Sequence, residues 1–208
     1  MFSNLKNLRM LVNGILGGIC IGIGGAFFLA IENKVIGSVF FSLGLFTICT
    51  RQLGLFTGRV GYLLDNDLHY IFELIAIWVG NLIGTNAVAY SLRMTRLAPA
   101  FIEKATIICN AKLNDNYLSL FILGIFCNIL MYIAVDGFKK NNHEFGKYLG
   151  LVFCVAGFIL AGFEHCVADM FYFGMANIWS DKVIFILLII TLGNIAGGLL
   201  IPILERLK

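Results

Sequence analysis

Proline and charged residues are scarce in this chain of 208 residues. Only Pro99 and Pro202 are prolines, and 13% of the residues are charged, against 60% that are hydrophobic. No ordinary water-soluble domain of this size is so poor in charge. Since a transmembrane helix needs about 20 mainly apolar residues, the length suits about six such helices with short connections. The composition predicts an all-α polytopic membrane protein with a single domain over residues 1–208.

Disulfide, metal and nucleic-acid signatures are also missing from the sequence. The cysteines form no CxxC pair and most lie in apolar stretches, so they are expected to be small buried hydrophobes. The net charge of +3 is spread among loops, which gives no support to nucleic-acid binding. There is no paired set of metal ligands and no nucleophile signature. We therefore expect no metal, no cofactor and no catalytic residues.

Six apolar stretches follow one another along the chain, at about 11–31, 35–50, 70–92, 117–135, 147–163 and 182–204. The first is too long for a signal peptide and is followed by no convincing cleavage site, so it is expected to be a retained helix. An even number of spans puts both termini on one side of the membrane. Lysine and arginine are slightly more frequent there, which favours cytoplasmic termini in a cell (inner) membrane. The longest connection, about 93–116, predicts a surface helix that packs or anchors to lipid.

Two of these stretches are interrupted. The second runs into RQLGLFTGRVGYL, and the fifth runs into AGFEHCVADMFYFG. Polar or non-helical backbone at membrane depth is tolerated only where it is buried in protein or lines a watery cavity. The two broken helices therefore indicate a conduction path.

The two halves of the chain also resemble each other. The letters ILG, with a cysteine three residues on, occur at Ile15 and again at Ile122, and a Gly-Asn pair ends in Asn81 and again in Asn194. Both asparagines are interpreted as structural residues near the pore. Each half then contains a helix, a broken helix and a helix, which predicts inverted repeats over about 1–92 and 117–208 joined by the linker. Matching interruptions in inverted repeats point to a site near the middle of the membrane.

His165 lies in the second interruption, whereas the other two histidines lie in predicted loops. An ionisable group within a membrane segment is costly and is by default a candidate functional residue, and imidazole exchanges protons near neutral pH. The alternative is a structural histidine whose hydrogen bonds are satisfied. Thr57 in the first interruption is expected to hydrogen-bond to the ring and fix its tautomer. Glu164 is interpreted as a structural residue that caps backbone amides or receives a positive helix N-terminus. Asp169 shares the His165 face if the helix continues.

Two further polar residues precede or lie within the fourth stretch. Lys112, read from the sequence alone, is either a solvated or snorkelling lysine or a residue of the conduction path. Asn128 lies deep in the stretch and needs hydrogen-bond partners across helices or in a pore.

At these positions the chain resembles the formate/nitrite transporter family of formate, nitrite and hydrosulfide channels. The motifs that carry the resemblance are LFTG around Thr57, GIFCNILMYIA around Asn128, AGFEHCVADM around His165 and LGN at Asn194. The resemblance implies that Thr57, Asn128 and His165 are central pore residues. It also implies that Lys112 is a vestibule lysine.

The same resemblance implies a hydrophobic constriction at Leu55, Phe56 and Phe158, and an aquaporin-like protomer assembled as a homopentamer with one pore per protomer. The chain departs from the family pattern at three places. Gly54 stands where a glutamate is common, Met131-Tyr132 replaces a Val-Cys pair, and Asp169 replaces a usual asparagine. These changes bear on selectivity and gating more than on the fold.

The resulting hypothesis is a channel or transporter for small monovalent weak-acid anions. Lys112 attracts the anion, a proton arrives from His165 or from water, and the neutral acid crosses. The expected partners are formate, nitrite or hydrosulfide, protons and membrane lipid. Two alternatives remain open at this point. One is a neutral-solute pore, although the twin Asn-Pro-Ala boxes of water and glycerol channels are absent, and the other is an intramembrane enzyme using His165.

Overall fold

The structure, a computed structural model, describes the backbone of residues 2–208 and the side chains from Lys6 onward, and this part of the chain is helical without strands. The helices in chain order are α1 (Phe2–Ala30), α2 (Lys34–Arg51), α3 (Phe56–Arg59), the 3-10 helix η1 (Val60–Asp65), α4 (Tyr70–Arg93), α5 (Ala98–Leu113), α6 (Tyr117–Lys140), α7 (Glu144–Ala161), α8 (Cys166–Ala176) and α9 (Asp181–Glu205).

Six of these helices, α1, α2, α4, α6, α7 and α9, are apolar enough to span a membrane, and their spans run for 18 to 25 residues. They coincide with the six predicted stretches, so the predicted all-α polytopic class is confirmed. The largest boundary difference is at α1, which begins at Phe2 rather than near residue 11. Helix α7 begins at Glu144, earlier than predicted, because the His143 ring accepts a hydrogen bond from Gly146 N and caps it.

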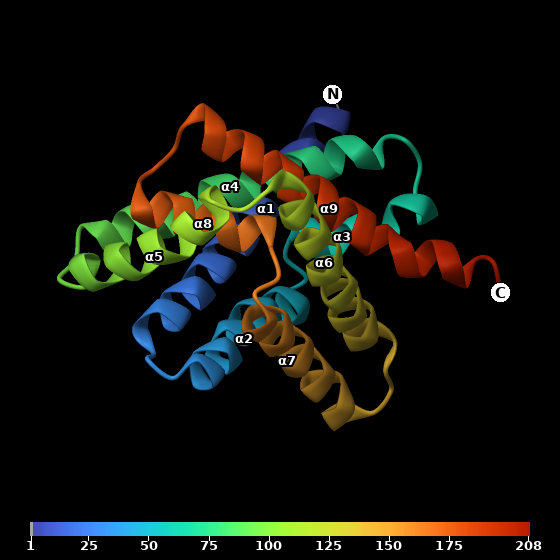
Figure 1. The fold of residues 1–208 in the computed structure, drawn as a ribbon. Helices are drawn as coiled ribbons and strands as arrows, with labels where there is room; N and C mark the ends of the chain where they lie inside the picture. The colour runs from blue at the N-terminus through green and yellow to red at the C-terminus, as the bar shows by residue number, and fades with distance from the viewer. Residues whose placement is uncertain (1) are drawn as a thin grey trace.

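The spanning helices pack in pairs. Helix α1 packs along α4 and helix α6 along α9, while the two broken helices, α2 and α7, lie side by side (Figure 1). The connecting helix α5 packs against α8, at one edge of the view. The two broken helices thus meet between two helix pairs, and their interrupted ends are enclosed by protein.

Both interruptions have the same backbone geometry. Helix α2 ends with Gln52 in the left-handed region (φ 56°), and α7 ends with Gly162 in that region (φ 74°). Leu55 and His165, the N-cap residues of α3 and α8, then have the same extended conformation. A left-handed residue is a common helix terminator. Gly54 and Gly58 flank the LFT letters of the first break, but the residue that turns the chain is Gln52.

A buried asparagine holds each interruption in place. The Asn81 side-chain amide donates to the carbonyls of Gly14 (2.7 Å) and Gly54 (2.9 Å), and its oxygen accepts from Phe56 N (2.9 Å). The bonds to Gly54 and Phe56 satisfy backbone groups that the break removes from helical pairing, and the bond to Gly14 ties the break to α1. Unpaired polar groups are costly inside protein or lipid, so the amide stabilises the break.

Asn194 repeats this arrangement at the second interruption. Its amide donates to the carbonyls of Gly124 (2.8 Å) and Glu164 (2.8 Å), and its oxygen accepts from Cys166 N (2.9 Å). Asn81 and Asn194, the two predicted structural asparagines, thus hold the interruptions of the two halves in the same way. We name them the asparagine staples.

These bonds also fix how the two halves correspond. Gly54 N donates to Asn13 O (3.1 Å), and Glu164 N donates to Leu123 O (3.3 Å). Gly124 is therefore the counterpart of Gly14, and not of Gly17 as the shared ILG letters suggested. The sequence match was wrong by one helical turn, because the packing between helices and not the identity of the letters sets the register.

The predicted surface helix in the linker is α5, which buries one face. Phe101, Ala105, Cys109 and Lys112 are its buried positions after Ala98, at a spacing of three or four residues that places them on one side. This face lies against α8. The main role of this face is thus packing. Lys112, the last buried residue of the face, lies in the protein interior.

Candidate functional site

Two separate cavities lie toward opposite ends of α2. One is lined by Ile48, Cys49 and Gln52 at the end of α2, together with residues of α3 and α6. The other is lined by Lys34 and Phe41, nearer the start of α2, together with residues of α5, α7 and α8. We name them the Arg59 cavity and the Lys112 cavity. Their lining residues do not overlap, so the interrupted segments form a barrier between them.

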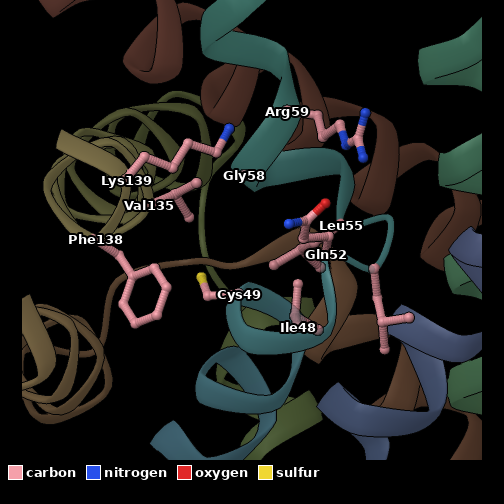
Figure 2. Close-up of a pocket in the computed structure, with 10 residues that line it drawn as sticks. Ile48, Cys49, Gln52, Leu55, Gly58, Arg59, Val135, Phe138 and Lys139 are labelled. Carbon is pink, nitrogen blue, oxygen red and sulfur yellow. The ribbon is translucent and has the colours of Figure 1, made fainter.

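The Arg59 cavity has a volume of about 540 Å³. Figure 2 shows the side chains of Arg59 and Lys139 at one end of it, and those of Ile48, Cys49 and Phe138 at the other. Both basic residues carry a positive charge at neutral pH. This cavity therefore combines a cationic part with an apolar part, and it was not predicted from the sequence.

The Lys112 cavity has a volume of about 360 Å³ and is mostly apolar. Its polar lining residues are Lys34, Lys112, Glu164, His165, Asp169 and Tyr172. Except for Lys34, these groups are buried or nearly so in the folded chain. The predicted vestibule lysine and the central histidine thus line the same cavity.

The predicted hydrogen bond between the two interruptions is present. Thr57 Oγ1 lies 2.8 Å from His165 Nε2, and both side chains are buried. Thr57 is in α3, and His165 is the N-cap residue that precedes α8. The two broken helices therefore meet through one polar pair at the centre of the molecule.

The other ring nitrogen of His165 decides the tautomer. His165 Nδ1 accepts a hydrogen bond from Ala168 N (3.0 Å) and so caps the first turn of α8. A nitrogen that accepts carries no hydrogen, so the hydrogen of the neutral ring is on Nε2 and points to Thr57 Oγ1. The Thr57 hydroxyl is then left to donate its own hydrogen elsewhere. Protonating Nδ1 would break the cap, and this arrangement therefore suits a neutral imidazole.

Aromatic rings cover the cavity side of His165. The Phe158 ring stacks on the imidazole with centroids 5.4 Å apart and planes 16° apart. Phe41 contacts Phe158 edge to face, with centroids 6.3 Å apart. Of the three predicted constriction residues, Phe158 lines the Lys112 cavity, Leu55 lines the Arg59 cavity, and Phe56 is buried but lines neither. Phe41 was missed because nothing distinguishes it among 19 phenylalanines.

Lys112 forms a buried cluster with two carboxylates. Its Nζ contacts Glu164 Oε2 closely and lies 3.0 Å from Asp169 Oδ1. The expectation that Glu164 caps backbone amides is wrong, because its carboxylate binds Lys112, and the ring of His165 caps α8 instead. The open reading of Lys112 as a solvated lysine is wrong too. We name these three side chains the Lys112 cluster.

Asn128 lies in the wall and not in either cavity. Its amide donates to Asn194 O (2.6 Å), while its Oδ1 is buried without a hydrogen-bond partner among the described residues. This bond links α6 to the backbone of α9 at Asn194, the asparagine staple of the second interruption.

The architecture defines a class of protein. Six apolar helices enclose two interruptions that meet at one buried polar pair, and a cavity lies on each side of that pair. This is the architecture of a multi-pass membrane channel or transporter, in which irregular backbone is enclosed by protein and adjoins a cavity.

The family follows from comparison. The model of the family described as formate/nitrite transporter matches residues 3–205, so the chain belongs to that family of membrane transport proteins. The fold agrees with a solved structure described as a pentameric formate channel with formate bound. The TM-score is 0.79 at 25% identity, and the match covers 97% of this chain and 96% of that chain.

Relatives of known sequence agree with this assignment. The Formate channel FocA of Haemophilus influenzae is 26% identical over 94% of this chain and 84% of its own length. A protein called Uncharacterized transporter YrhG, from Bacillus subtilis, is 30% identical over 91% of this chain and 80% of its own length. The relatives are named channels and transporters, which supports a transport protein and not an enzyme.

Proposed function

We propose that this chain conducts small monovalent weak-acid anions of the formate, nitrite or hydrosulfide type, which cross the barrier as the neutral acid. The observation that carries the proposal is the buried bond of 2.8 Å between Thr57 and His165, placed between two cavities. The family and the formate channels among the relatives support the substrate class.

The barrier explains why protonation is needed. Transferring a bare ion into an apolar environment is opposed by a Born cost idealised at about 20 kcal/mol, which remains several kcal/mol after relaxation. The rings of Phe41 and Phe158 and the side chain of Leu55 make the path between the cavities apolar. Desolvation raises the pKa of the substrate acid, so the anion takes up a proton before it enters.

His165 has an orienting role in this proposal. Its Nε2–H is directed at Thr57 and its Nδ1 caps α8, so the neutral ring offers hydrogen bonds without adding a charge to the barrier. The Thr57 hydroxyl donates its free hydrogen to the passing acid or anion. The proton that neutralises the anion then comes from the aqueous side of the Lys112 cavity, and Lys112 attracts the anion to that side.

The same proposal covers assembly and location. The chain acts as one channel domain of two inverted repeats, about 1–92 and 117–208, in a homopentamer embedded in lipid. Its likeness to a pentameric formate channel over 97% of the chain supports this assembly. Both termini lie in the cytoplasm and the protein resides in the cell (inner) membrane, as the distribution of basic residues favours.

The test is flux in liposomes that contain the purified protein. Uptake of formate, nitrite and hydrosulfide is followed against pH for the wild type, His165→Phe and Thr57→Ala. We expect uptake that rises as pH falls in the wild type and a marked loss in both variants. His143→Asn is the matched control, because His143 is an exposed histidine that caps α7 through its side chain, as asparagine also does.

Two results would contradict the proposal. Equal pH-dependent uptake in the wild type, His165→Phe and Thr57→Ala would remove the role of the central pair. Osmotic swelling of the liposomes without uptake of any of the three anions would indicate a neutral-solute pore instead. Competition among the anions in the same assay ranks them as substrates.

A further inference from the structure

The Lys112 cluster carries an unbalanced charge. One ammonium is in contact with two carboxylates, those of Glu164 and Asp169. All three side chains are less than a tenth exposed. With every group ionised the cluster has a net charge of −1 in the interior. A buried charge without a partner costs several kcal/mol, so the fully ionised cluster is unfavourable.

One carboxylate oxygen indicates how the charge is balanced. Asp169 Oδ2 is buried and has no hydrogen-bond partner among the described residues, whereas Oδ1 of the same group contacts Lys112. An ionised carboxylate oxygen at such a place has no hydrogen bond to offset the cost of its burial. A hydrogen on the carboxyl group removes the charge, and two carboxylates held at one site characteristically share one proton.

The surroundings supply no other counter-charge. The titratable groups facing Asp169 are Lys112 and Glu164 of the cluster together with Cys109 of α5, Cys127 of α6, and Cys166 and Tyr172 of α8. His165 and Lys34 line the same cavity. The thiols and the phenol are neutral when protonated, His165 is engaged at both nitrogens, and Lys34 is exposed to solvent at the start of α2.

We propose that the Lys112 cluster holds one proton on the Glu164–Asp169 pair, and that this pair is the proton donor for the anion in the Lys112 cavity. The inference rests on the proposed function for the identity of the acceptor. In the step, the O–H bond of the carboxylic acid breaks and a bond from that hydrogen to the anion forms. The neutral acid moves on past His165, and the carboxylate regains a proton from a hydronium ion of the vestibule water.

Asp169 differs from an asparagine in carrying a proton that it can release. The resemblance of the sequence to its family indicated that an asparagine is usual at this position, and an asparagine has the same shape but no acidic proton. A protonated Asp169 leaves the cluster as neutral as an asparagine would, since Lys112 and Glu164 then balance each other. The aspartate adds a releasable proton without adding a permanent charge.

The first test locates the proton without any transport measurement. The infrared C=O stretch of a protonated carboxylic acid is recorded on the purified protein at neutral pH, in water and in deuterium oxide. We expect the band in the wild type and its loss in Asp169→Asn. Asp136→Asn is the matched control, because Asp136 has one lysine partner, Lys140, and a hydrogen bond from Tyr62, so that its charge is already balanced.

A wild-type protein with no such band at any pH above about 5, where ordinary carboxylates are ionised, would overturn the inference. So would a band that persists unchanged in both Asp169→Asn and Glu164→Gln. The wild-type measurement is decisive even if a variant fails to fold.

The second test addresses the donor role. Above its pKa, the neutral fraction of an acid falls about tenfold per pH unit. Formate uptake in Asp169→Asn is expected to follow that slope, whereas uptake in the wild type falls less steeply while the pair keeps its proton. Equal slopes would overturn the donor role. Absence of anion uptake in both proteins would contradict the proposed function, and the infrared band would still show whether the cluster holds a proton.

Discussion

The two interruptions share a backbone and differ in almost every functional side chain. The left-handed residues Gln52 and Gly162, and the staples Asn81 and Asn194, occupy matching places. The residues that follow do not match in chemistry, since Leu55 stands at the position that His165 occupies in the second break.

Charge shows the same contrast. In the register fixed by the staples, Gly54 corresponds to Glu164 and Arg59 corresponds to Asp169. Arg59 lines one cavity and Asp169 lines the other. A repeated backbone thus supports an asymmetric path, with a basic residue on one side and an acidic one on the other. The backbone hydrogen bonds determine the fold, and the unmatched side chains determine the chemistry.

The largest expected loss of stability comes from replacing one of the asparagine staples, which the two halves have in common. Asn194→Ala leaves two buried backbone groups without partners, the Glu164 carbonyl and the Cys166 N–H, and removes a further bond to the Gly124 carbonyl within α6. At about 1–3 kcal/mol for each of these two groups, the loss of stability is about 2 kcal/mol or more. Asn81→Ala is expected to cost a similar amount. Thermal unfolding of the two variants in detergent measures this, and a large cost at only one site would contradict the equivalence of the staples.

The next largest expected effect on stability is at Gly17, where the packing of the first half differs from that of the second. A Cβ on Gly17 would lie 2.0 Å from Gly54 O, so Gly17→Ala forces the first break apart. Overpacking of this kind costs about 1–3 kcal/mol or more. Cys127, the matching residue of the second half, already has a side chain, and Cys127→Ala is expected to cost about 1 kcal/mol.

Thermal unfolding again provides the measurement for these two variants. Gly137→Ala is the control, because no heavy atom lies within 4 Å of the Cβ it would add. A Gly17→Ala protein as stable as the Gly137→Ala protein would show that the first break has room that the structure does not indicate.

A smaller effect concerns the bond that joins the breaks. Thr57→Val keeps the shape but removes the acceptor for His165 Nε2–H, at a cost of about 1 kcal/mol, or roughly fivefold in flux. Thr57→Ser restores the hydroxyl and is expected to restore most of the flux. Nitrogen NMR of labelled histidine is expected to show the Nε2–H tautomer in the wild type. A wild-type ring protonated on Nδ1 alone would contradict the capping bond to Ala168.

The smallest effect sharpens the contrast in charge between the cavities. Arg59→Gln removes one partly exposed cation from the Arg59 cavity. Anion uptake from that side is expected to fall roughly twofold at low ionic strength, as for a screened surface charge, and the difference is expected to shrink as salt is added. An effect that is independent of salt would mean that Arg59 acts by packing and not by charge.

Much of the fold was predictable because it depends on local composition. A run of apolar residues long enough to span lipid identifies a helix without knowledge of its neighbours, and the polar residues around Thr57 and His165 stand out within such runs. Even the contact between these two residues was predictable, since matching interruptions in inverted repeats meet near the centre. The bond of 2.8 Å confirms that prediction.

The remaining features depend on contacts between distant segments. Lys112 and Glu164 are far apart in the sequence, and only the packing of α5 on α8 brings them together. Gln52 gave no signal, because glycine and not glutamine is the usual residue at a left-handed helix end. The Arg59 cavity was also not predicted. Arg59 and Lys139 are far apart in the sequence, and each looks like an ordinary charge at the end of an apolar stretch.

Helix α5 has no counterpart in the first half of the chain, and it brings Lys112 to only one of the two cavities. If the path were truly two-fold symmetric, it would respond identically when the direction of the driving force was reversed. With α5 in place, an ion entering from one face meets the Lys112 cluster, and an ion entering from the other face meets Arg59 and Lys139. The joining segment thus gives the path a direction, and the initial rates of uptake under equal substrate gradients of opposite direction should be unequal.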